Sequence, residues 1–209
     1  MPPLLCYRHP IKRKKGVKLM RLLKIAAAGG LLMTLAAPAS AQNGDGAAFV
    51  EAVRQGDGNK ASELLGKRPS GLLDSRAEDG ETPLTIALGR RDEDWTSFLL
   101  TRGASANLPG KNGDTPLIVA ARVGYADAIG WLLTMEAKVE ADNRQGETPL
   151  IVAVQQRQLP IARTLLAAGA DPDNSDFSGY SARDYALRDP RARDILKLIE
   201  TKKPKVSKP

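Results

Sequence analysis

TPLTIA at residues 82–87, TPLIVA at 115–120 and TPLIVA at 148–153 are near-identical copies of one pattern. The copies follow one another at an equal interval, and a degenerate fourth copy, Ser181-Ala182-Arg183 with Ala186, keeps the same step. This interval, about 33 residues, falls in the range of roughly 20 to 50 that marks a solenoid, in which similar short units stack on one another. The sequence therefore predicts a repeat fold.

A second marker, a pair of large aliphatic residues, keeps the same period. The pairs are Leu99-Leu100, Leu132-Leu133, Leu165-Leu166 and Leu198-Ile199, with an earlier pair at Leu64-Leu65. In that earlier unit, Phe49 and Ala52 stand where Leu84 and Ala87 stand in the next one. Two markers in phase across the units set the repeat length independently of each other.

Each position of the pattern suits one place in a pair of helices. Thr82 has the side-chain oxygen that an N-cap needs, and Pro83 fits the first helical position because no N–H is required there. Leu84 and Ala87 lie three positions apart and therefore share one helix face. The unit is predicted to be a turn, a short helix, a loop and a longer helix. One such unit cannot bury its apolar face alone, so stacking must supply the core.

Glycine-containing links fit the gaps between these helices. Gly103 and Gly169 follow second helices, where a left-handed terminator is expected. Asp79-Gly80 and Asn112-Gly113 are hairpin-turn dipeptides that would join one unit to the next.

This pattern resembles the ankyrin-repeat family over about residues 47–200, and exported bacterial members with a signal peptide are the closest likeness. The resemblance implies an all-α solenoid of helix-turn-helix pairs, with about four to five repeats including the capping units. It places the ankyrin-repeat domain at 42–200. Its units are a capping repeat at 47–80, repeats at 81–113, 114–146 and 147–179, and a C-terminal cap at 180–200.

Two departures from the family pattern carry expectations of their own. The family commonly has His after Thr-Pro-Leu, where this chain has Thr85, Ile118 and Ile151, so the hydrogen bonds of that His are missing or replaced by apolar packing. Glu136 stands in the position of Gly103 and Gly169. A positive φ at a residue with a Cβ costs about 1–2 kcal/mol, which predicts a local weak point.

Charge is distributed unevenly along the chain. The protein has 31 Lys and Arg against 24 Asp and Glu, but eight of the basic residues and no acid lie in residues 1–41. Residues 42–209 then have 23 basic and 24 acidic groups, which removes the argument for a nucleic-acid partner. His9 and Cys6, the chain's single His and Cys, also precede residue 42. This excludes Ser-His-Asp and Cys-His catalysis and His or Cys metal sites from the repeats, and we expect no enzyme, cofactor or metal.

The first 41 residues are typical of an export signal. A basic stretch precedes thirteen mostly apolar residues, 25–37, and Ala39-Ser40-Ala41 then predicts cleavage between Ala41 and Gln42. Counting from Met20 gives 22 residues, within the usual range of about 15 to 30, so Met20 is the expected start. The expected location is the periplasm or the exterior, with membrane contact during export. An uncleaved N-terminal anchor is the alternative.

In the ankyrin family, partners dock on the concave surface formed by turn tips and first helices. The residues that the repeat phase places there are Glu78, Asp79, Glu81, Lys111, Asn112, Asp114, Arg144, Gln145, Glu147, Phe177 and Tyr180 at the tips, and Arg90, Arg122, Val123, Gln155 and Gln156 at the helix ends. Phe177 and Tyr180 would supply an aromatic anchor for a protein partner. The alternative is a solvated edge that only keeps the solenoid soluble.

The remaining conspicuous segments have structural interpretations. Trp95 and Trp131 are expected to pack between repeats, and Asp92-Glu93-Asp94 to start a helix. The run 171–176 resembles a calcium loop but lacks its Gly and final Glu, so it is expected to be a repeat link. Residues 201–209 form a basic tail that is expected to be disordered.

Taken together, the sequence predicts a monomeric, non-catalytic protein–protein interaction module. An envelope-associated factor held by its basic tail or by an uncleaved signal, and an effector secreted onward to another cell, are the alternatives.

Overall fold

The computed structural model describes residues 40–67 and 71–201. Across these residues the chain forms ten α-helices, two short 3-10 turns and no β-strand, which confirms the predicted all-α class. The predicted signal peptide and the basic tail fall almost entirely in 1–39 and 202–209, outside the described residues. Cleavage between Ala41 and Gln42, which lie in the first turn of the first helix, stays a prediction.

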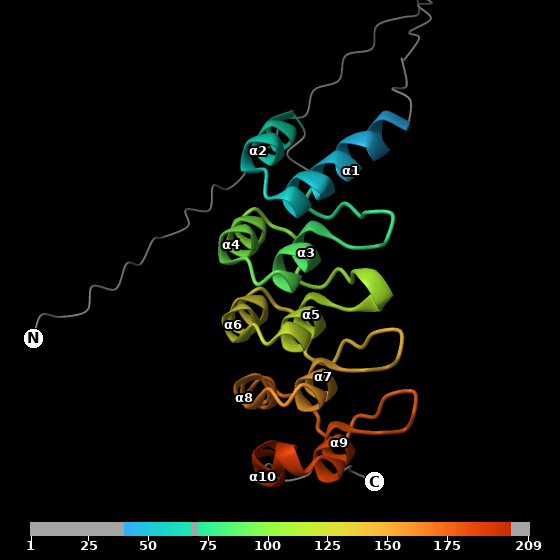
Figure 1. Cartoon of the computed structure of the whole chain (residues 1–209), viewed down its shortest axis with the longest axis vertical. Helices are drawn as coiled ribbons and strands as arrows, with labels where there is room; N and C mark the ends of the chain where they lie inside the picture. The colour runs from blue at the N-terminus through green and yellow to red at the C-terminus, as the bar shows by residue number, and fades with distance from the viewer. Residues whose placement is uncertain (1–39, 68–70, 202–209) are drawn as a thin grey trace, which may run out of the picture. The chain divides into compact units, whose positions relative to one another are not determined.

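The helices come in five pairs that stack along one direction (Figure 1). The pairs are α1 (Ser40–Gln55) with α2 (Gly58–Lys67), α3 (Pro83–Gly89) with α4 (Glu93–Thr101), α5 (Pro116–Val123) with α6 (Ala126–Thr134), α7 (Pro149–Gln155) with α8 (Leu159–Ala167), and α9 (Ala182–Arg188) with α10 (Arg193–Thr201). The 3-10 turns are η1 (Lys111–Gly113) and η2 (Pro190–Ala192).

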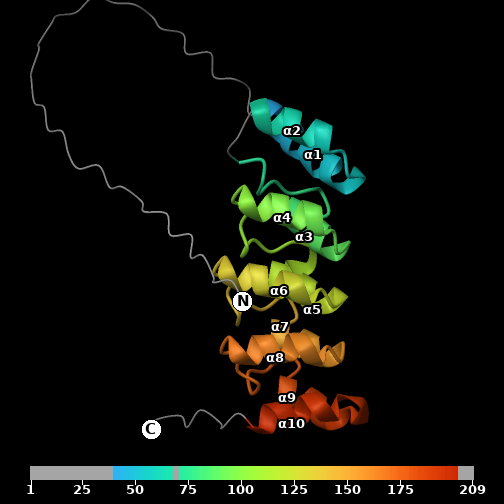
Figure 2. The ribbon, with the colours of Figure 1, turned by 90° about the vertical axis from the view of Figure 1, so that its left-hand side faces the viewer.

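Odd-numbered and even-numbered helices form two separate rows. Helix α3 packs on α4 within its own pair and on α1 and α5 in the neighbouring pairs. The long links between pairs project beside the odd-numbered row, on the side away from the even-numbered row (Figure 1). Figure 2 looks onto the even-numbered row. The stack therefore has a loop face and an outer-helix face.

The Thr-Pro-Leu pattern starts a helix at equivalent corners of the stack. The side-chain oxygen of Thr82 accepts a hydrogen bond from the N–H of Thr85 at 3.2 Å, and Thr115 and Thr148 accept from Ile118 and Ile151 at 3.4 and 3.3 Å. Ser181 caps α9 in the same way, with Asp184 closing a capping box. The prediction that these residues are N-caps is confirmed.

The repeated leucines and alanines are the core of the stack. Leu84, Leu117 and Leu150 are buried, and so are the alanines three positions after each of them. Phe49 and Ala52 are buried in α1, as the repeat phase predicts. Each pair thus contributes one apolar layer between its two neighbours.

The family's missing His is replaced in two ways. Ile118 and Ile151 are fully buried, so apolar packing takes the place of a hydrogen bond. Thr85 instead turns back on its own helix, where its hydroxyl donates to the carbonyl of Thr82 at 3.0 Å.

Left-handed backbone recurs at the repeat period in the links, where Gly80, Gly113, Gly146 and Gly179 have positive φ, and at two further places. After the second helices, Gly103 and Gly169 have φ of 95° and 103°, and Glu136 has φ of 59°, as predicted. Between the helices of a pair, Arg91 and Arg157 also have positive φ, where the equivalent residue of the α5–α6 pair is Gly124. Gly56 occupies the same position in the first pair, with φ of 74°. This second position escaped prediction from sequence because two of its four copies are arginines.

Candidate partner-binding groove

The expected binding residues lie between the projecting links and the odd-numbered helices. Two hollows open on this face. One, of about 420 Å³, is lined by α1 and residues 77–79. The other, of about 380 Å³, is lined by Arg122 of α5 and by the tips of two successive links. We call this face, from α1 to α9, the groove.

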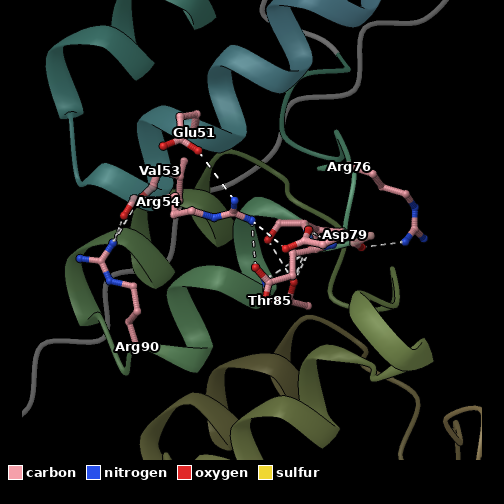
Figure 3. Close-up of polar contacts among 10 residues, drawn as sticks. Glu51, Val53, Arg54, Arg76, Asp79, Thr85 and Arg90 are labelled. Carbon is pink, nitrogen blue, oxygen red and sulfur yellow. Dashed lines mark hydrogen bonds and ion pairs between the residues drawn. The ribbon is translucent and has the colours of Figure 1, made fainter.

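Charge at the α1 end of the groove is arranged around Arg54. Its guanidinium lies 3.1 Å from the carboxylates of both Asp79 and Glu81, and 3.8 Å from Glu51 (Figure 3). These groups are all at least one-third exposed, so the pairs orient the side chains more than they stabilise the fold. Asp79 and Glu81 were predicted from the sequence, but the cation that binds them was not.

Arg90 is used to hold two repeats together. Its guanidinium donates to the carbonyls of Val53 and Arg54 at 3.2 and 2.8 Å, at the C-terminal end of α1. In Figure 3 it points to that helix end and lies apart from Asp79. A cation at a helix C-terminus satisfies carbonyls that have no partner within the helix. Arg90 therefore has a structural function in the groove wall.

A polar network joins the two central repeats at the floor of the groove. Asn143, which is 5% exposed, donates to Asp114 at 2.8 Å and to Glu147 at 2.9 Å. Arg122 donates to the same two carboxylates at 3.1 and 3.4 Å, and Gln155 donates to Glu147 at 3.1 Å. The structure thus brings together four of the predicted residues from successive repeats.

Asn143 is the member of this network that sequence reasoning missed. Its side-chain oxygen also accepts from the N–H groups of Gln145 and Glu147, which braces the link from inside. Asp176, at the equivalent position of the next link, accepts from Ser178 and Tyr180 in the same way. Asn and Asp bond to nearby backbone readily in turns, so their recurrence at the repeat period was a usable signal.

Another set of predicted residues lies at the tips of the links. The exposed residues there are Glu78, Lys111, Arg144 and Phe177. Asn112, which follows Lys111, and Gln145, which follows Arg144, are exposed as well. Gln156, the C-cap of α7, is also exposed, whereas Val123 packs partly against the core.

The α9 end of the groove is aromatic. Arg188 lies over the ring of Tyr180, 3.8 Å from its centroid, and Tyr180 meets Tyr185 edge to face. Tyr185 donates to Asp176 at 2.7 Å, and this hydrogen bond raises the pKa of the Tyr185 hydroxyl. Phe177 is 76% exposed, and its ring sits so close to Gly146 that a Cβ there would be 2.6 Å from it.

The outer-helix face carries two hollows that sequence reasoning did not anticipate. One, of about 300 Å³, is lined by Trp95 and Phe98, and the other, of about 240 Å³, by Trp131 and Met135. Both tryptophans are partly buried against the core, as predicted, and each also lines one of these two hollows.

Several titratable groups near the last pair of helices are engaged in structural pairs. Arg183 lowers the pKa of Asp173, and Ser181 lowers that of Asp184. The N–H of Arg191, with Arg157, lowers the pKa of Asp189. In the run resembling a calcium loop, Asp173 is bound by Arg183 and Asp176 by Tyr185. The described residues contain no group of three or more His, Cys, Asp or Glu side chains that could hold a metal ion, and no helix among them is long and apolar enough to span a bilayer.

A family model described as ankyrin repeats (3 copies) matches residues 49–143 and 97–176. These matches together span more than half of the chain. The chain belongs to the ankyrin-repeat family. No curated protein matches it. Ankyrin repeats are typical of protein–protein interaction modules and are in general non-catalytic.

Proposed function

We propose that this ankyrin-repeat protein is a non-catalytic, monomeric binding module of the bacterial periplasm, and that a protein partner docks in its groove. The observation that carries the proposal is the network of Asp114, Arg122, Asn143 and Glu147. It fixes the groove floor across two repeats, while the tips above it are exposed. A rigid floor with exposed tips lowers the entropy cost of ordering side chains when a partner binds.

Catalysis lacks a comparable site on the described surface. The groove hollows are open to solvent, and all of their carboxylates except the exposed Glu78 are bound by Arg54, Arg122 or Asn143. Enzymes instead gather groups with perturbed pKa values in an enclosed site. Turnover of a hydrolase substrate by the purified protein, abolished by a single substitution in the groove, would contradict this part of the proposal.

The periplasmic location rests on the signal-like segment 1–41. Cell fractionation and the intact mass of the exported protein test it. We expect a periplasmic species that begins at Gln42 and elutes as a monomer in light scattering. A mature form that retains Arg21 would mean an anchored protein. Release from membranes by high salt would point instead to attachment through the basic tail.

Docking in the groove can be tested by placing a photo-cross-linking residue at single exposed positions. Gln145 and Gln156 report on the groove, and Thr134 and Arg163 report on the outer-helix face as matched controls. We expect one protein from a periplasmic extract to cross-link at the groove positions and not at the controls. Equal capture from both faces, or capture from the outer face alone, would overturn the proposed groove.

A further inference from the structure

The tip residues of the four links form a column with an ordered chemistry. Glu78, Lys111, Arg144 and Phe177 recur at the repeat period, so they occupy the same place in successive links. All four are exposed, and no hydrogen bond or ion pair of their side chains was found within the described residues. We call these four residues the tip column; it reads acid, base, base, aromatic.

The three links that carry Lys111, Arg144 and Phe177 are joined to one another by backbone hydrogen bonds. The N–H of Arg144 donates to the carbonyl of Asn112 at 3.2 Å, and the N–H of Phe177 donates to that of Gln145 at 3.0 Å. Stacked helices lie about 8 to 10 Å apart, so neighbouring tips are held about one such step from each other. The spacing of the column is therefore built into the fold.

Lys111 and Arg144 differ from the cations deeper in the groove. Arg54 and Arg122 each meet two or more carboxylates within 4 Å, whereas Lys111 and Arg144 meet none among the described residues. A partner's carboxylate can therefore pair with Lys111 or Arg144 without breaking an ion pair already present. Glu78, at one end of the column, would repel a further carboxylate of the partner, and Phe177, at the other end, offers an apolar surface.

An extended peptide can match this spacing. A polyproline II helix rises about 3.1 Å per residue with three residues per turn, so every third side chain lies on one face about 9 Å from the last. Acidic residues at positions 1 and 4, followed by an apolar residue at position 7, would meet Lys111, Arg144 and Phe177 in order.

We propose that the tip column binds an extended, acidic segment of a partner protein, with two carboxylates three positions apart and an apolar residue three further on. This inference rests on the proposed function, because it names the chemistry of a partner that docks in the groove. The complementary charge of Lys111 and Arg144 and the exposed ring of Phe177 carry it.

The test uses the purified full-length protein and fluorescent synthetic peptides. The probe EPPEPPL has the proposed spacing, EEPPPPL has the same composition with the acids adjacent, and QPPQPPL has no charge. We expect EPPEPPL to bind more tightly than both others in fluorescence anisotropy. Lys111→Ala and Arg144→Ala should each weaken it about fivefold, the range of a partly exposed ion pair. The matched control Arg163→Ala, which removes an exposed cation from the outer-helix face, should leave binding unchanged.

A charge swap keeps the test informative about specificity. Arg144→Glu should abolish tight binding of EPPEPPL and favour EPPKPPL, in which position 4 is basic. Equal affinity for all three original peptides, or no effect of Lys111→Ala and Arg144→Ala, would overturn the inference. So would DNA or heparin binding with the same dependence on these residues, because that would indicate unspecific polyanion binding. Each of these outcomes leaves the cross-linking test of the groove unaffected, so the two failures are distinguishable.

Discussion

In the central pairs α5–α6 and α7–α8, the residues between the helices are apolar and fully buried. Ile118, Leu132, Ile151 and Leu165 have no exposed surface, and each first helix begins with Thr-Pro-Leu. The last pair, α9–α10, begins instead with Ser181-Ala182-Arg183, so a half-buried arginine stands where the central pairs have a buried leucine. Less apolar area is therefore available to hold it on the stack.

Carboxylates add polar contacts to the buried Ala186, Ile195 and Ile199 that hold the last pair on the stack. Asp173 binds Arg183 through two hydrogen bonds of 2.6 and 3.0 Å, and Asp189 binds Arg157 of the preceding pair at 2.6 Å. The carboxylate of Asp176 accepts a hydrogen bond from the hydroxyl of Tyr185. The centre has carboxylates of its own, Asp114 and Glu147 in the groove floor, but burial of apolar side chains, which does not vary with pH, holds most of it together. The end buries less apolar surface and therefore relies more on groups that titrate.

The centre should respond most strongly to the loss of apolar volume. Leu132→Ala removes a fully buried side chain, so we expect the free energy of unfolding to fall by about 3 kcal/mol, as for other large-to-small core substitutions. Urea unfolding followed by circular dichroism measures it. Leu187→Ala, at a position 60% exposed in the last pair, is the control and should change little. If Leu132→Ala and Leu187→Ala lowered the free energy of unfolding by similar amounts, the contrast between centre and end would be wrong.

The end should respond first to acid. The folded state lowers the pKa of Asp173, Asp184 and Asp189 from the ordinary value of 3.8. A lowered carboxyl pKa contributes stability above about that value and loses it as the pH falls through the folded pKa. We therefore expect α9 and α10 to lose amide-exchange protection below about pH 4, before the centre does.

Two probes separate the regions in this experiment. Trp131 lies in α6 of the centre and Trp95 in α4 of the adjoining pair, so their fluorescence reports on the stack outside the last pair, while hydrogen exchange resolves the last pair. Asp173→Asn is the matched variant, and it should reduce the acid sensitivity of α9–α10 at the cost of some stability at pH 7. Simultaneous loss of both signals at one pH would show that the stack responds to acid as a single unit.

The same contrast explains how much could be predicted from sequence. Helix starts and core positions follow from local chemistry that repeats, such as Thr-Pro at a cap and leucine facing a neighbour. Glu136 was recognisable as left-handed because glycine occupies its place in other copies. These features need no knowledge of which side chains meet across repeats.

The features that could not be predicted are contacts between side chains of different repeats. Arg90 was expected to face the groove, and its reach to the carbonyls of α1 depends on how the first two pairs stack. The bridge from Asn143 to Asp114 and Glu147 likewise requires two links to lie side by side. The hollow beside Trp131 is lined by residues of both α4 and α6, which a single repeat does not reveal.

The link between α6 and α7 offers the smallest but sharpest test, because it lies inside the centre and is nevertheless strained. Glu136 has φ of 59°. Its side chain makes no hydrogen bond or ion pair within the described part of the chain, and its backbone carbonyl accepts a hydrogen bond from the side-chain amide of Asn107. Glu136→Gly removes a backbone strain of about 1–2 kcal/mol. It also makes the unfolded chain more flexible, and this entropy costs about 0.5–1 kcal/mol of stability. The net gain should raise the melting temperature by about 1–3 °C for a domain of this size.

The reverse substitution at the equivalent position completes this test. Gly103 has φ of 95°, and a Cβ added to it would meet no other atom within 4 Å, so Gly103→Ala should destabilise through backbone strain alone. We expect its melting temperature to fall while that of Glu136→Gly rises. If Glu136→Gly lowered the melting temperature, the side chain of Glu136 would have to stabilise the central pairs by more than the strain of its backbone costs.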